Sequence, residues 1–131
     1  MRYDLELVSQ LCQEIGLRAT SSAGAVAIEL AAGVSLVFHN AEQDVNCLVG
    51  FNGTPWHVHD GFTFVDGRGN YIEMDYLDVI SGLADGRVLV CERAKLNQVT
   101  DRWLVHKDHN DEFQHMERGE HITVWRPTTV K

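Results

Sequence analysis

Two histidines separated by one residue stand in the segment NGTPWHVHDG, residues 52–61, and could bind a metal ion. Residues i and i+2 of an extended chain project to the same side, so His57 and His59 would lie side by side while Trp56 and Val58 face the interior. Neutral imidazole binds zinc, iron, copper or nickel, and a complete site needs at least a third ligand. The candidates for that ligand are Asp60, Asp66, Glu73, His106 and His121. The pattern suggests a zinc or iron site with its third ligand left open.

The sequence also allows two simpler interpretations of this pair. In one, which we favour, His57 and His59 are solvent-facing side chains beside a buried Trp56, in a chain that contains seven histidines. In the other, they form a proton-linked switch, because histidine titrates near physiological pH. The sequence has neither a nucleophile elbow nor a phosphate loop, so triad catalysis and nucleotide hydrolysis are not predicted.

The histidine segment resembles the first metal-binding stretch of cupin barrels, in which glycines precede the pair and a glutamate follows it. Gly53 precedes the pair here, but Thr63 and Phe64 stand where the glutamate is expected. The later proline-glycine-histidine portion of the cupin pattern is not recognisable. The resemblance covers only residues 52–61 and implies a metal-binding cupin-like protein or enzyme that uses His57 and His59.

The charge of the chain favours a protein partner over a nucleic acid. Nineteen acidic against eleven basic residues give a net charge of -8, which repels phosphate backbones and accelerates encounter with a basic protein. The polar segment at residues 108–120 is a candidate acidic docking surface through Asp108, Asp111 and Glu112, with Trp125 as an exposed aromatic beside it. The alternatives are a merely solvated loop, a core-packed Trp125, and an acid excess that serves solubility.

The cysteines and the apolar stretches indicate the compartment. Cys12, Cys47 and Cys91 stand among apolar neighbours, and their odd number predicts free thiols in a reducing cytoplasm. Residues 1–16 lack the apolar core and cleavage site of a signal peptide, and the apolar stretch at 23–38 is too short to span a membrane. We therefore expect a cytoplasmic protein without a membrane segment.

Periodicity along the chain predicts one α+β domain over residues 1–131. Apolar residues recur at helical spacing over residues 5–15, with Gly16 as a stop, and a short internal helix follows Asp75 and ends before Gly86. Alternating residues predict strands over 26–30, 34–38, 45–51, 61–65, 70–74, 87–93, 102–107 and 121–126. The expected architecture is an antiparallel, hairpin-rich sheet, open or partly closed into a barrel, with an N-terminal helix and one short internal helix.

Two turns are predicted from local sequence, and Pro55 places the histidines near a sheet edge. The sequence SSAG at residues 21–24 favours a turn, and Asn52 with Gly53 could supply the positive φ angles of a type I′ turn. Pro55 cannot donate a hydrogen bond to a ladder, so the segment TPWHVH is expected to be an edge strand or an extended loop.

The size, the acidity, the Trp-His-x-His segment and the tail pattern DRWLVHKD…GEHITVWR, residues 101–108 and 119–126, resemble small acidic bacterial immunity proteins of polymorphic toxin systems. This resemblance implies a stoichiometric binder that covers the active site of a basic toxin and has no catalysis of its own. We therefore expect a non-enzymatic cytoplasmic binding protein without a cofactor, and a metal-binding cupin-like protein or enzyme is the alternative.

Overall fold

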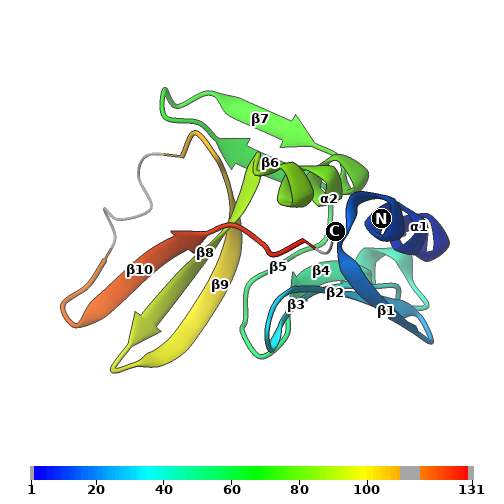
Figure 1. The fold of residues 1–131 in the computed structure, drawn as a ribbon, viewed down its shortest axis with the longest axis horizontal. Helices are drawn as coiled ribbons and strands as arrows, with labels where there is room; N and C mark the ends of the chain where they lie inside the picture. Colours follow the sequence, from blue (N-terminus) through cyan, green and yellow to red (C-terminus); the bar gives the residue numbers. More distant parts are fainter. Residues whose placement is uncertain (1, 110–115, 130–131) are drawn as a thin grey trace.

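The computed structural model describes residues 2–109 and 116–129 and has the predicted α+β architecture (Figure 1). Two helices, one short 3-10 helix and ten strands make up its regular structure. In chain order they are α1 (Leu5–Ile15), β1 (Arg18–Ser22), β2 (Ala25–Ala31), β3 (Val34–His39), η1 (Asp44–Asn46), β4 (Leu48–Phe51), β5 (His57–Val58), β6 (Phe62–Val65), β7 (Tyr71–Met74), α2 (Tyr76–Asp85), β8 (Val88–Lys95), β9 (Gln98–His106) and β10 (Glu120–Trp125).

The strands form three antiparallel sheets. The largest has the order β1-β2-β3-β4-β5, so each strand lies beside its neighbour in sequence, and β1 and β5 are its edges. A second sheet has the order β10-β8-β9, and β6 pairs with β7 in a separate hairpin. In Figure 1 both helices lie over the largest sheet, and the three-stranded sheet stands to one side of it. The described strands thus leave open edges and do not close into a barrel.

Both helices begin and end where local chemistry predicts. Asp4 caps α1 by accepting a hydrogen bond from the Leu7 amide at 3.1 Å, and Asp75 caps α2 by accepting one from the Asp78 amide at 2.8 Å. Gly16 follows α1 in the left-handed conformation, which a residue without Cβ adopts at little cost. Neither helix in residues 2–109 or 116–129 has the length and apolar character needed to cross a membrane.

A continuous hydrophobic core joins both helices to the sheets. Alternate residues of β2 and β3 are buried, as their period of two requires, and Phe38 is fully buried at the centre. The helices contribute Val8 and Cys12 from α1 and Val79, Ile80 and Leu83 from α2. Cys12, Cys47 and Cys91 are buried free thiols, as the sequence predicts.

Two strands differ from the sequence prediction: β1 was not predicted, and β4 is shorter than predicted. All five residues of β1 are exposed, so this edge strand shows no alternation, and its turn is confined to the residues after Ser22. The strand predicted over residues 45–51 begins only at Leu48. Val45 lies in η1 with 72% of its surface exposed, although its sequence position matches the alternation of β4.

The type I′ turn predicted at Asn52 and Gly53 is wrong. The Asn52 side chain instead accepts a hydrogen bond from the Ser35 amide at 2.8 Å and donates one to the Gly33 carbonyl at 3.2 Å, which fixes the end of β4 against the β2–β3 turn. Among the described residues, only Leu96 and Asn97 have positive φ without being glycine. They form the two-residue turn between β8 and β9, so these strands extend to Lys95 and Gln98, beyond the predicted ranges of 87–93 and 102–107.

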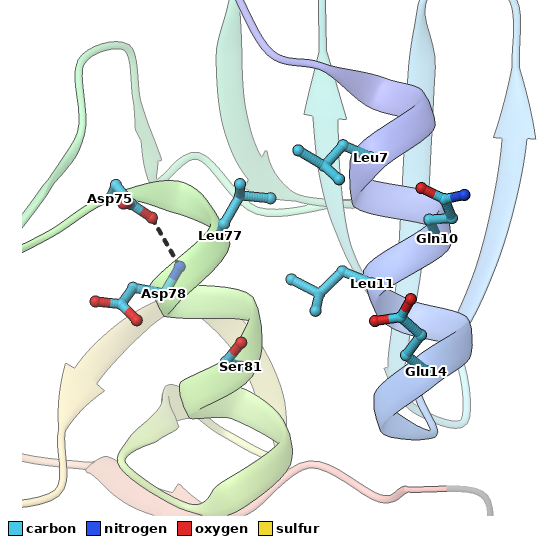
Figure 2. A pocket seen from close by; sticks show the side chains of 8 residues that line it. All are labelled: Leu7, Gln10, Leu11, Glu14, Asp75, Leu77, Asp78 and Ser81. Carbon is cyan, nitrogen blue, oxygen red and sulfur yellow. Dashed lines mark hydrogen bonds between the residues drawn. The ribbon is translucent and has the colours of Figure 1, made fainter.

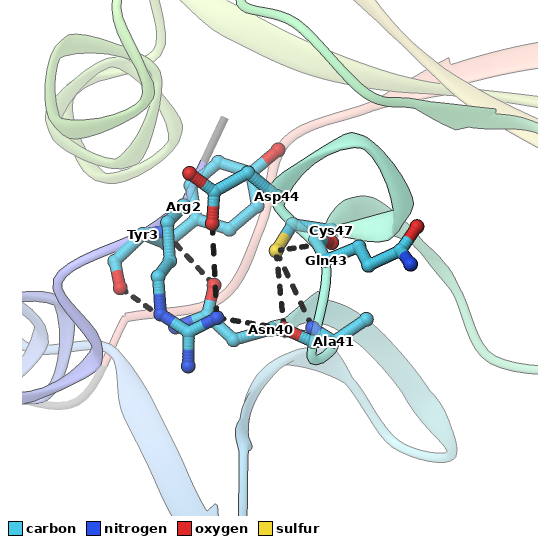
Figure 3. Close-up of polar contacts among 7 residues, drawn as sticks. All are labelled: Arg2, Tyr3, Asn40, Ala41, Gln43, Asp44 and Cys47. Atoms are coloured by element: carbon cyan, nitrogen blue, oxygen red, sulfur yellow. Dashed lines mark hydrogen bonds and ion pairs between the residues drawn. The ribbon is translucent and has the colours of Figure 1, made fainter.

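The segment before α1 is attached to the end of β3 by a reciprocal pair of hydrogen bonds (Figure 3). The Tyr3 amide donates to the Asn40 side chain at 2.9 Å, and the Asn40 side chain donates to the Tyr3 carbonyl at 2.8 Å. Arg2 donates to the Ala41 carbonyl at 2.6 Å, and the Ala41 amide donates to the Cys47 sulfur at 3.3 Å. These contacts fix where α1 begins relative to the sheet.

The phenol of Tyr3 gives the fold a measurable pH dependence. Burial raises the pKa of Tyr3 to about 12, and the nearby Cys47 and Asp60 act in the same direction. An unfolded tyrosine ionises near pH 10, so between about pH 10 and 12 the folded chain binds the extra proton and the free energy of unfolding falls as pH rises. Urea unfolding of the wild type and Tyr3→Phe should show this extra decrease only in the wild type. Parallel curves for the two proteins above pH 10 would contradict it.

Gly82 lets α2 pack closely on β8. A Cβ at this position would lie 2.7 Å from Cγ2 of Val88, nearer than carbon atoms approach without displacement. Gly82→Ala should therefore lower the free energy of unfolding by about 1–3 kcal/mol, although alanine favours an isolated helix by about 1 kcal/mol. In a Val88→Ala background, Gly82→Ala should lower the free energy of unfolding by less than it does in the wild type. A double-mutant cycle with urea unfolding measures this difference. Additive effects would rule out this contact as the cause.

Candidate functional site

The flanks of α1 and α2 enclose a groove of about 290 Å³ (Figure 2). Figure 2 shows the side chains of Leu7, Leu11 and Leu77 pointing into the space between the helices. Leu7 is 40% exposed, whereas Leu11 and Leu77 are half-buried against the core. The remaining lining residues are polar or acidic: Gln10, Glu14, Asp75, Asp78 and Ser81. The groove therefore has an apolar floor and a polar, acidic rim.

The charged residues that line this groove are all acidic: Glu14, Asp75 and Asp78. The two helices and their N-cap residues also contain Asp4, Glu6 and Asp85 and no basic residue, and Asp85 is paired with Arg87 just after α2 at 2.8 Å. Glu14 and Asp78 are both exposed on the groove rim, while Asp75 also serves as the helix cap. Since like charges on one face add their potentials, this face attracts cations and repels anions.

The groove follows from how α1 divides its apolar residues. Val8 and Cys12 are fully buried against the sheet, and they belong to the stripe that sequence analysis used to predict the helix. Leu7 and Leu11, four residues apart, form a second stripe on the flank that faces α2. This second stripe is visible in the sequence, but the facing Leu77 follows about seventy residues later, and sequence alone does not bring the two together.

His57 and His59 lie side by side near the edge strand β5, as predicted. Their ring centroids are 5.0 Å apart and their planes are nearly perpendicular, at 88°. His57 Nδ1 is 2.9 Å from the Pro55 carbonyl oxygen, and His59 Nδ1 is 3.0 Å from the Cys47 carbonyl oxygen. His57 is exposed and His59 is half-buried, while Trp56 packs against the core. Each ring is thus held in place by a backbone carbonyl.

The predicted third ligands are not gathered around this pair. Within residues 2–109 and 116–129, no three His, Cys, Asp or Glu side chains are grouped so that they could hold a metal ion. Asp66 organises the β6–β7 turn, where hydrogen bonds from the amides of Asn70 and Arg68 lower its pKa. His106 is buried beside Phe64, with its Nδ1 3.7 Å from the Asp108 carboxylate.

Glu73 and His121 occupy separate parts of the fold. Glu73 is exposed on β7 and lines a hollow with Asp60, whereas His121 is exposed on β10. The structure therefore keeps the histidine pair together and supplies no complete ligand set among its described residues.

The predicted docking residues are only partly covered by the structure. Asp108 has an exposed side chain just after β9, and Trp125 is half-buried and packs against the main core at the end of β10. Asp111 and Glu112 lie outside the described residues. The sequence prediction of an acidic docking surface at residues 108–120 thus stays a prediction, and the helix groove is an acidic surface that it missed.

Comparisons with protein-family models, with curated proteins and with solved structures find no match to this chain.

The position of His57 depends on Gly50, which faces it across the β4–β5 pair. A Cβ on Gly50 would lie 2.9 Å from the Trp56 carbonyl oxygen and 3.1 Å from Cβ of His57. Gly50→Ala should therefore displace β5 and Trp56, which should shift the tryptophan fluorescence of the chain, and lower the free energy of unfolding by about 1–3 kcal/mol. Urea unfolding followed by tryptophan fluorescence measures both effects. Wild-type fluorescence and stability would show that β5 does not need this close approach.

Proposed function

We propose that this protein is a non-enzymatic, cytoplasmic binding protein that holds a basic protein partner in the groove between α1 and α2. The observation that carries the proposal is a groove with an apolar floor, Leu7, Leu11 and Leu77, whose charged lining residues are all acidic. An inhibitor of a basic toxin, of the immunity type that the sequence resembles, is the specific role we propose.

The chemistry of the groove indicates the kind of segment that binds. Apolar side chains of a partner would cover the three leucines, because removing their exposed area from water provides most of the affinity. Lys or Arg side chains flanking these anchors would reach the rim at Glu14 and Asp78. Since both helices are anchored to the core, the groove is preformed and little conformational entropy is lost when a partner binds.

The proposed compartment is supported by the thiols. Three free cysteines, each buried in the fold, are compatible with a reducing compartment, where such thiols persist. Burial raises the pKa of Cys12 to about 11, which keeps this thiol protonated and unreactive at neutral pH. These thiols therefore act as small packing groups in the proposed binding protein.

A designed peptide tests the groove directly. A fluorescent amphipathic helix with leucines on one face and lysines on the other should bind the wild type in a salt-sensitive way. Reversing two rim charges in the Glu14→Lys, Asp78→Lys variant should weaken binding about tenfold or more at low salt, mostly through slower association, with a smaller difference at high salt. Stopped-flow fluorescence and anisotropy measure the rates and the affinity.

A matched variant distinguishes binding in the groove from binding at the predicted docking surface, residues 108–120. Asp108→Lys with Glu117→Lys changes the net charge by the same amount at two exposed positions outside the two helices. This variant should bind the peptide almost as the wild type does. If it loses the same affinity as the groove variant, general charge attraction explains the binding. If it alone loses affinity, the docking surface lies at residues 108–120 and not between the helices.

A further inference from the structure

The histidine pair has a defined protonation pattern. A backbone carbonyl oxygen only accepts hydrogen bonds, so Nδ1 of His57 donates to the Pro55 carbonyl, and Nδ1 of His59 donates to the Cys47 carbonyl. In each neutral ring the proton therefore resides on Nδ1, and the lone pair resides on Nε2. Histidines that bind metals in proteins are commonly held in this way, because the second hydrogen bond fixes the tautomer and the ring orientation.

The spacing of the rings suits a shared metal ion. A zinc–nitrogen bond of about 2.1 Å, extended by an imidazole radius of about 1.1 Å, places a metal about 3.2 Å from each ring centroid. Two centroids 5.0 Å apart then correspond to an angle at the metal of about 100°. This angle lies between the octahedral value of about 90° and the tetrahedral value of about 109°, so the distance between the two rings is compatible with one shared metal ion.

We propose that His57 and His59 form a two-histidine surface site for a divalent transition metal ion of the zinc or copper type, bound through the Nε2 atoms. The described residues add no third His, Cys, Asp or Glu to the pair, so water fills the other coordination positions. The ion is therefore exchangeable, and its open positions accept an oxygen or nitrogen ligand from a second molecule. This site does not depend on the helix groove.

Zinc titration followed by calorimetry tests the site, using untagged protein without any peptide. The wild type should bind Zn²⁺ at one site. His57→Ala should weaken that binding about tenfold or more, because losing a ligand costs at least as much affinity as losing a group that only orients one. Because His57 is exposed, its replacement leaves the core intact. His59→Ala should have the same effect, and far-UV circular dichroism confirms that each variant is folded.

The matched control removes two exposed histidines elsewhere in the fold. His39→Ala with His121→Ala changes the histidine count by as much as the double replacement at positions 57 and 59. This control should bind Zn²⁺ like the wild type. Equal zinc affinity in the wild type and in the His57→Ala, His59→Ala variant, or loss of binding only in the control variant, would overturn the proposal.

Electron paramagnetic resonance of the Cu²⁺-loaded protein gives an independent readout. In the wild type, coordination by two imidazoles should appear as hyperfine coupling of the copper electron to two nitrogen ligands. In His57→Ala, coupling to only one nitrogen ligand should remain. A spectrum of copper with oxygen ligands only would also overturn the proposal. These measurements use no peptide, so a negative result for metal binding does not bear on the groove. A negative result with the peptide likewise does not bear on the metal site.

Discussion

The fold depends on one constraint: the two helices must cover the same apolar face of the five-stranded sheet. Phe38, at the centre of that face, is fully buried and lies 5.3 Å from the Tyr3 ring, just before α1, and 6.1 Å from the Tyr76 ring, at the start of α2. Tyr3 and Tyr76 also contact each other at 5.1 Å. Because both helix starts converge on one side chain, α1 and α2 lie next to each other, and the groove between their flanks is a consequence of that packing.

Hydrogen bonds make this arrangement specific as well as compact. The Asp4 amide donates to the Tyr76 hydroxyl at 3.1 Å, so the N-cap of α1 is joined directly to the first turn of α2. The reciprocal pair between Asn40 and Tyr3 joins the same segment to β3 (Figure 3). Removing one partner of such a hydrogen bond lowers stability more than removing both, because the remaining buried group is left without a hydrogen bond. These bonds therefore fix the starts of α1 and α2 relative to each other and to β3.

The parts of the fold that the sequence predicted are those with local causes. Asp4, Gly16 and Asp75 act on neighbouring amides and carbonyls, and Pro55 places the histidine pair at an edge through a property of its own backbone. The exposed strand β1 was not predicted, because none of its residues is buried and the sequence there shows no apolar alternation. The turn at Leu96 escaped it because leucine rarely adopts a positive φ, and the register of β8 with β9 imposes that conformation here.

The groove could not be predicted from neighbouring residues, because Leu7 and Leu77 meet only after the sheet has brought α1 and α2 together. The assembled groove also holds an acid at an unfavourable helix position. Glu14 lies near the C-terminus of α1, where the helix dipole is negative, and the last turn of α1, all of which the structure describes, contains no basic residue. Such an acid costs about 0.3–1 kcal/mol when it is exposed at a helix end. A cation of the basic partner that we propose would offset that cost when it binds at this end of the groove.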